Sequence, residues 1–228
     1  YKKPNVGKTY PIETPVESDE FNANELGLQW QWQANSNPLW CFPNGVNGYL
    51  RMFAWNLIGD AKNLWDAPAL LMQKLPAPNF SATTKLTFSP FKVGERAGLV
   101  VFGQDYGVIT IDNTDKGLVI NQSSCKNAPK GNVEVINGSL ASTNSTVYFR
   151  VEVKQTKSLN KENIAEPKAT CTFSYSLDGK KFTVLGNPFV AWEGKWVGAK
   201  VGIFCQRNGW LNDSGYADFD WFRIEPLK

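Results

Sequence analysis

The chain has 228 residues and a formal net charge of +3. That length suits one large β-domain, which buries roughly 70% of the surface of its unfolded chain. The basic residues are scattered, which argues against a nucleic-acid surface, and no apolar run approaches the ~20 residues of a membrane span. There is no histidine, which excludes Ser-His-Asp and Cys-His catalysis and every histidine-based metal site.

Residues 1–18 differ in character from the rest of the chain. They carry Pro4, Pro11 and Pro15 and few large apolar side chains. We expect this stretch to be an extended linker, and the chain to be a mature form or a fragment of a longer protein. A single β-domain is then expected over residues 19–228.

Strands are predicted where apolar and polar side chains alternate with a period of two. In chain order, they are expected over residues 28–32, 49–53, 69–74, 80–88, 97–102, 106–111, 118–121, 132–136, 147–154, 171–175, 181–185, 196–205 and 215–224. Residues 97–102 are nearly all apolar, as in a strand buried on both faces, whereas residues 155–168 are expected to form a charged loop. This pattern predicts an all-β fold, an antiparallel β-sandwich of jelly-roll or lectin-like type.

The closing strand carries two carboxylates. Alternation predicts Ala217, Phe219 and Trp221 on one face, and Asp218, Asp220 and Phe222 on the other. Their backbones would lie about 6–7 Å apart, a separation at which paired carboxylates could flank a sugar. However, the Glu-x-Asp-x-x-Glu strand motif of lectin-like hydrolases does not occur, so we expect no catalysis by this chain alone.

Four cysteines are widely spaced and form no CxxC motif, which argues against zinc. They are Cys41, Cys125, Cys171 and Cys205. One or two disulfides and buried free thiols are both compatible with this spacing.

Nine tryptophans are an unusually large number, and sugar rings stack on such flat side chains. Trp30, Trp32 and Trp221 lie in regular strands and are expected to pack inside. The tryptophans outside the obvious core alternation are Trp40, Trp55, Trp65, Trp192, Trp196 and Trp210. Each of these either packs on the sandwich or faces a partner.

Several segments, taken in order, resemble a known module. They are residues 18–22, 28–32, 64–73, 82–86, 97–99, 175–179, 196–198, 201–205 and 217–222. Together they resemble the C-terminal concanavalin A-like β-sandwich of glycoside hydrolase family 43 enzymes, of the β-xylosidase and α-L-arabinofuranosidase type. Each motif alone is weak, and the specificity lies in the ordered set.

This resemblance implies an accessory domain of a hemicellulose-degrading enzyme. The hydrolytic carboxylates would lie on an N-terminal catalytic propeller, to which residues 1–18 would lead. The partners would be that catalytic domain and a xylan or arabinoxylan chain, and the protein would be secreted or periplasmic. Two alternatives are a free-standing carbohydrate-binding lectin and a purely structural spacer.

The resemblance also implies individual site residues. An aromatic side chain of this module helps to close the substrate site in the family, and Trp196 occupies the position of the phenylalanine in a Phe-x-Gly pattern. Trp192 is the alternative, and Trp210 and Trp40 are further candidates for sugar contact.

Lectin-like sandwiches often hold a structural calcium where the first and last strands meet. Asp19 or Glu20 with Asp218 would supply carboxylate ligands of the kind that calcium prefers. Structural calcium is therefore a candidate cofactor, and the alternative is that Asp218 and Asp220 are solvated or hydrogen-bonded to loop amides.

Overall fold

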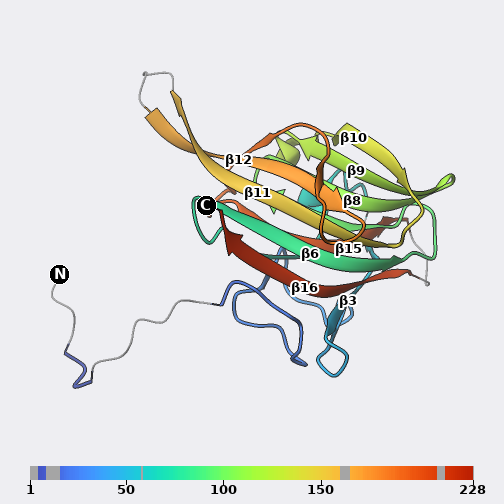
Figure 1. Cartoon of the computed structure of the whole chain (residues 1–228), viewed down its shortest axis with the longest axis horizontal. Helices are drawn as coiled ribbons and strands as arrows, with labels where there is room; N and C mark the ends of the chain where they lie inside the picture. The colour runs from blue at the N-terminus through green and yellow to red at the C-terminus, as the bar shows by residue number, and fades with distance from the viewer. Residues whose placement is uncertain (1–4, 9–15, 58, 160–164, 210–213, 228) are drawn as a thin grey trace.

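A computed structural model shows two eight-stranded sheets stacked face to face (Figure 1). It describes residues 5–8, 16–57, 59–159, 165–209 and 214–227. Every strand pair but one is antiparallel. The predicted antiparallel β-sandwich is confirmed, and no helix in the described part of the chain is long and apolar enough to cross a membrane.

We call the two layers sheet A and sheet B. Sheet A has the order β13 (Thr183–Val184), β12 (Ala165–Ser176), β11 (Thr146–Leu159), β6 (Phe80–Ser89), β16 (Tyr216–Pro226), β3 (Tyr49–Phe53) and β2 (Cys41–Asn44), with β14 (Phe189–Ala191) beside β12. Sheet B has the order β1 (Gln31–Trp32), β5 (Leu70–Lys74), β15 (Lys200–Asn208), β7 (Arg96–Phe102), β8 (Tyr106–Thr114), β9 (Gly117–Cys125) and β10 (Val135–Ser142), with β4 (Trp55–Leu57) beside β15. Two single-turn helices, η1 (Leu64–Asp66) and η2 (Ala128–Lys130), lie in the connections.

The main core lies between the sheets. Leu86, Phe149 and Phe173 point inward from sheet A, and Leu99 and Ile109 point inward from sheet B. All five side chains have no exposed surface, and burying a large apolar side chain stabilises a fold by roughly 1.5–3 kcal/mol. The predicted strand alternation follows from this single buried layer.

A second, smaller core covers the outer face of sheet B. It is built from Leu64, Ala67, Leu70, Met72, Val100, Phe102, Tyr106, Val108, Cys125, Ala128 and Phe204. Leu64 and Ala67 belong to the segment 59–69, which packs on this face, and Ala128 belongs to η2. Leu99 faces one core and Val100 the other, so the prediction that residues 97–102 are buried on both faces is confirmed.

The predicted charged loop over residues 155–168 is wrong for its described part. β11 continues to Leu159 and pairs with β12 from Ala165 onward. Figure 1 shows the ends of these two strands projecting beyond the body of the sandwich. Residues 155–157 are exposed, so this part of β11 carries no alternation of buried and exposed side chains from which a strand could be predicted.

The closing strand corrects a second expectation. The register of β16 against β6 shifts between Phe219 and Trp221, which is a β-bulge. Because a one-residue shift exchanges the two faces, Phe222 joins Phe219 in the core, and Trp221 lies outside. The ring of Trp221 instead lies 4.2 Å from the guanidinium carbon of Arg223.

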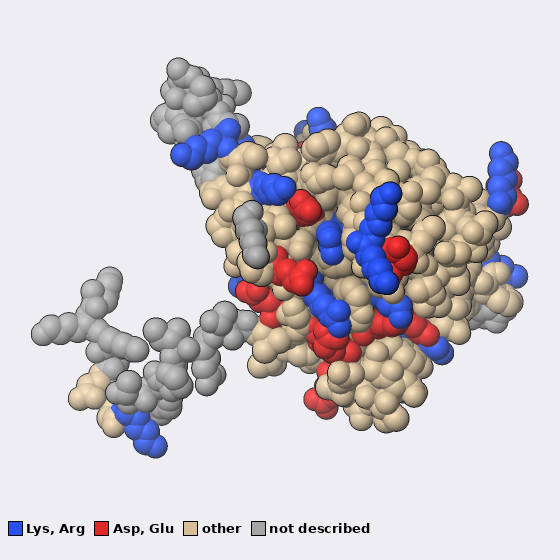
Figure 2. Space-filling view, in the orientation of Figure 1, with Lys and Arg blue, Asp and Glu red and all other residues tan. Residues whose placement is uncertain are grey.

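The outer face of sheet A is a surface of matched charges, and Figure 2 shows acidic and basic side chains side by side on the face in view. Arg51 forms a bidentate ion pair with Asp218 at 2.7 and 2.8 Å, and Lys85 pairs with Asp220. The two aspartates of β16 are therefore neutralised separately and do not form a free carboxylate pair.

All four cysteines carry free thiols, and Cys125, Cys171 and Cys205 are buried. Burial raises the pKa of the Cys41 thiol to about 11 and that of Cys171 to about 12. Of the two arrangements that the spacing allowed, the structure has the reduced one.

The bulge in β16 makes a testable prediction about stability. Phe222→Ala should lower the free energy of unfolding by about 3–5 kcal/mol, because it leaves a cavity in the main core. Trp221→Ala should cost clearly less, since its ring lies on the outer face. Urea unfolding of both variants measures this, and a larger loss for Trp221→Ala would contradict the shifted register.

Candidate functional site

The segment between β14 and β15 forms a loop that is fixed by its backbone. The amide of Gln104 donates to the carbonyl oxygen of Glu193 at 2.9 Å, and the amide of Gly194 donates to that of Val197 at 2.9 Å. A Cβ at position 103 would lie 1.8 Å from the carbonyl oxygen of Trp192. Glycine at position 103 therefore allows the loop to pass against the β7–β8 turn.

Trp196 stands at the outer end of this loop with 94% of its surface exposed. Trp192 is 45% exposed, and the Lys168 ammonium lies 4.8 Å from the centre of its ring. An exposed tryptophan on a loop held by backbone hydrogen bonds is a preformed platform for a flat ligand. The two residues nominated first for sugar contact therefore lie on one loop at the surface.

A crevice of about 210 Å³ lies beneath Trp196. Its walls include Gln33, Trp65, Phe102, Lys195, Trp196 and Lys200. Typical ligand pockets measure roughly 300–1,000 Å³, so this crevice suits one ring or the end of a chain. A second protein surface placed over it would be needed to enclose a longer ligand.

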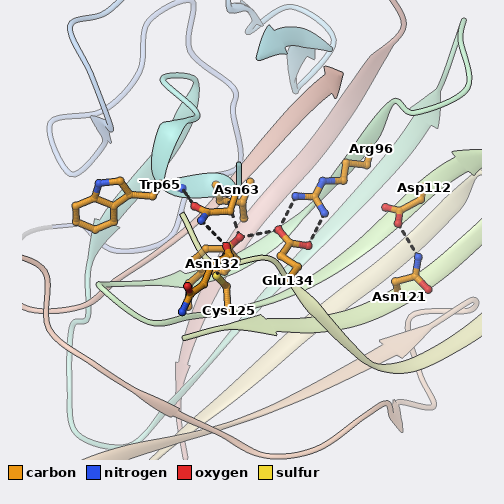
Figure 3. Close-up of polar contacts among 10 residues, drawn as sticks. Asn63, Trp65, Arg96, Asp112, Asn121, Cys125, Asn132 and Glu134 are labelled. Atoms are coloured by element: carbon orange, nitrogen blue, oxygen red, sulfur yellow. Dashed lines mark hydrogen bonds and ion pairs between the residues drawn. The ribbon is translucent and has the colours of Figure 1, made fainter. Parts of the chain in front are cut away.

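Trp65 is held in the crevice wall by the residues around it. Asn63 caps η1, and its side-chain oxygen accepts from the amide of Trp65 at 2.8 Å. The Asn63 amide group donates to the carbonyl oxygens of Ala128 and Asn132 at 3.0 and 2.7 Å (Figure 3). The indole then stacks on Phe102, with ring centres 5.7 Å apart.

A polar network continues along the same outer face of sheet B. Phe102 stacks on Tyr106, whose hydroxyl donates to Glu134 at 2.8 Å. Arg96 donates to both oxygens of Glu134 at 2.7 Å (Figure 3). Burial raises the pKa of the Glu134 carboxyl, but the charge and hydrogen bonds of Arg96 and the bond from Tyr106 lower it by more, so the net shift is downward.

A cavity of about 450 Å³ lies beside this network and is lined in part by Arg96, Asp112, Glu134 and Gln206. The guanidinium of Arg96 is already occupied, because it donates to Glu134. With the Gln206 amide turned so that its oxygen faces Arg96, the guanidinium also donates to that oxygen at 2.9 and 3.0 Å. We interpret the network as structural. The Trp196 crevice, whose aromatic surface is open, is the better candidate for a binding site.

Of the other two nominated tryptophans, Trp40 does not line this crevice. Trp40 is only 4% exposed and packs edge-on against Trp32 and Trp55. It offers no ring face to a sugar, so its nomination is corrected. Trp210 lies outside the described residues.

The carboxylates proposed for calcium are separated and already have partners. Asp19 accepts from the amide of Phe21 and the indole of Trp30, both at 2.8 Å, and Glu20 forms a bidentate pair with Arg223. Asp218 is held by Arg51. The first and last strands do meet, through the bridge of Asp19 to Phe222.

These carboxylates do not fit a shared calcium site, because cations or N–H donors occupy their oxygens. Among the residues that the structure describes, no three potential protein ligands of the His, Cys, Asp or Glu type converge. We derive no function from calcium, which stays an untested prediction.

Sequence reasoning missed the residues that surround Trp196. Gln33 lies far along the chain from Lys195 and Lys200, and these crevice residues share no motif. The network of Arg96 and Glu134 joins residues 38 positions apart. The one available signal was the clustering of Trp192, Lys195 and Trp196 in a single short segment.

The two stacked sheets, the bulged closing strand and the exposed loop define an all-β domain of the concanavalin A-like class. The sequence model of the "Beta xylosidase C-terminal Concanavalin A-like domain" matches residues 18–225. The chain therefore belongs to this family, and the predicted resemblance is confirmed.

Two curated relatives are longer proteins. A β-xylosidase from Formosa agariphila is 28% identical over 99% of this chain and 37% of its own length. A non-reducing end α-L-arabinofuranosidase from Bacteroides ovatus is 26% identical over 100% of this chain and 40% of its own length. The chain thus spans about two fifths of these relatives.

Solved structures give the same picture. A bifunctional GH43-CE protein from Bacteroides eggerthii has a TM-score of 0.76 at 25% identity, covering 92% of this chain and 26% of that one. An engineered GH43 glycoside hydrolase, described as displaying both endo-xylanase and exo-arabinofuranosidase activity, has a TM-score of 0.80 at 18% identity, covering 100% of this chain and 44% of that one. The latter likeness shows the fold alone.

The Arg96–Glu134 pair predicts a large loss of stability when it is broken. Its side chains are 20% and 16% exposed, so Glu134→Gln leaves a largely buried guanidinium without its counter-charge and should cost about 3 kcal/mol. Glu20→Gln, which breaks the half-exposed pair with Arg223, is the matched control and should cost at most about 1 kcal/mol.

The same pair sets a pH dependence. Because folding lowers the pKa of Glu134, its stabilisation is fully present above the pKa of the unfolded carboxyl and is lost as the pH falls through the lower folded value. The stability difference between wild type and Glu134→Gln should therefore shrink in acid. Urea unfolding across pH measures it, and a difference that grew in acid would contradict the assignment.

Proposed function

We propose that this chain is an accessory domain of a hemicellulose-acting glycoside hydrolase and that its Trp196 loop completes the substrate site of a catalytic domain. Two observations support the proposal. The family is defined as the C-terminal domain of β-xylosidase, and the curated relatives contain more than twice the length that this chain spans. The partner would be the catalytic domain of the same polypeptide.

The observation that carries the proposal is the placement of Trp196. Its ring is 94% exposed, yet its loop is anchored at Gly103 and Gln104. An aromatic ring held in this way can stack on a sugar without first being ordered, which lowers the entropic cost of binding. The crevice that it lines is open to solvent, and a catalytic domain would cover it.

The substrate class follows from the same relatives. Their names describe a β-xylosidase and an α-L-arabinofuranosidase, which supports an oligosaccharide of the xylan or arabinoxylan type. We assign no hydrolytic role to Asp218 and Asp220, because Arg51 and Lys85 neutralise them. Export to the periplasm or the medium stays a prediction.

The test is Trp196→Ala in the enzyme that contains this chain and its catalytic domain. We expect kcat/KM on xylo-oligosaccharides to fall about tenfold, which corresponds to about 1.4 kcal/mol of lost stacking. The thermal stability should stay within about 0.5 kcal/mol, because an exposed side chain is removed.

Trp221→Ala is the matched control, since it removes an indole from the outer face of sheet A. It should leave kcat and KM unchanged. Unchanged kinetics in Trp196→Ala would reject the proposed contact and favour a structural spacer. Tight binding of xylan by the isolated chain, with no effect in the enzyme, would favour a free-standing lectin.

A further inference from the structure

Two lysines face each other where the Trp196 crevice adjoins a second hollow: Lys200 lines the crevice, and Lys74 lines the hollow, which shares Val197 and Gly198 with it. Lys74 ends β5, Lys200 begins β15, and the two residues are direct partners in the register. Lys74 shares its face with Met72, and Lys200 shares its face with Phe204, both of which belong to the outer core. Both ammonium groups therefore project from the outer face of sheet B, where directly opposed like charges are destabilising.

Elsewhere the molecule follows the opposite rule. Arg51 and Asp218 are direct cross-strand partners and form an ion pair, as do Lys85 and Asp220 on neighbouring strands. Within the described part of the chain, neither Lys74 nor Lys200 has a carboxylate within ion-pair distance. The like-charged pair is thus an exception to the pattern of the fold.

The surroundings add to the positive charge. Lys195 lies 5.9 Å from the centre of the Trp65 ring, and Lys200 lines the crevice beneath Trp196. Lys74 lines the shallow hollow on the other side of Val197. Burial, and then the charge of Lys74, lowers the pKa of Lys200, which agrees with two ammonium groups that repel each other.

We propose that this crevice receives an anionic sugar residue, whose negative group lies between Lys74 and Lys200 while its ring contacts Trp196. The inference rests on the proposed function and specifies the substrate class of that site. An anion would accept hydrogen bonds from both ammonium groups and cancel their repulsion. A uronic acid carboxylate and a sulfate ester share this chemistry.

The test compares matched ligands by isothermal titration calorimetry on the 228-residue chain. The probes are a xylo-oligosaccharide carrying one glucuronic acid, the same oligosaccharide after reduction of its carboxyl group, and a sulfated xylo-oligosaccharide. We expect an anionic probe to bind at least about tenfold more tightly than the reduced one at low salt. This preference should weaken as ionic strength rises, and the stronger anionic probe identifies the anion.

The variants Lys74→Gln and Lys200→Gln should each abolish the preference. They should also raise the melting temperature of the unliganded chain, because each removes the repulsion; purely structural lysines would not behave in this way. Lys180→Gln, which removes an exposed lysine from the turn before β13, is the control and should change neither quantity.

Equal affinity for the charged and reduced probes, or no binding of any anionic probe, would overturn the inference. Neither result would reject the proposed function, which is decided by the kinetics of Trp196→Ala. Conversely, Trp196→Ala could leave the enzyme kinetics unchanged while the preference for anionic probes persists. That result would support the anion-binding site and reject its contribution to the substrate site of the enzyme.

Discussion

The structure depends on covering sheet B on both of its faces. Strands such as β7 present apolar side chains to both sides, with Leu99 in the main core and Val100 in the outer one. Leaving the outer face in water would forfeit roughly 25 cal/mol per Å² of apolar surface. The segment 59–69 supplies the cover, and Asn63 ties it to the residues around η2. The same segment places Trp65 in the crevice wall, so the position of the candidate site follows from the way in which the outer face of sheet B is covered.

Charge is distributed over the sandwich in two distinct ways. On sheet A, opposite charges lie across neighbouring strands, which gives a surface whose local field is small. On sheet B, where β5 ends and β15 begins, Lys74 and Lys200 have no such counterparts among the residues that the structure describes. The ion pairs on sheet A suit a surface that faces solvent. The positive charges beside the exposed Trp196 ring on sheet B suit a surface that binds a ligand.

The sequence predicted the parts of this molecule that local pattern determines. The strand expected over residues 49–53 coincides with β3, and the doubly buried strand is β7. Patterns of period two could not reveal the bulge that turns Trp221 outward, because one inserted residue exchanges the faces without changing the composition. Nor could they predict that Lys74 faces Lys200, since that contact depends on which strands become neighbours. From the sequence alone, Trp196 was one of six candidate tryptophans, and the resemblance singled it out.

An exposed indole raises the question of what holds it in place, because its own packing does not. The loop around Trp196 is positioned by main-chain hydrogen bonds and by the close approach that glycine at position 103 permits. The side chain of Trp196 is therefore exposed, and burying its ring against a partner would stabilise the complex. Because the backbone is already fixed, little of that free energy is spent on ordering the loop. This arrangement costs the isolated domain little and gives its benefit only when a second surface or a sugar covers the ring.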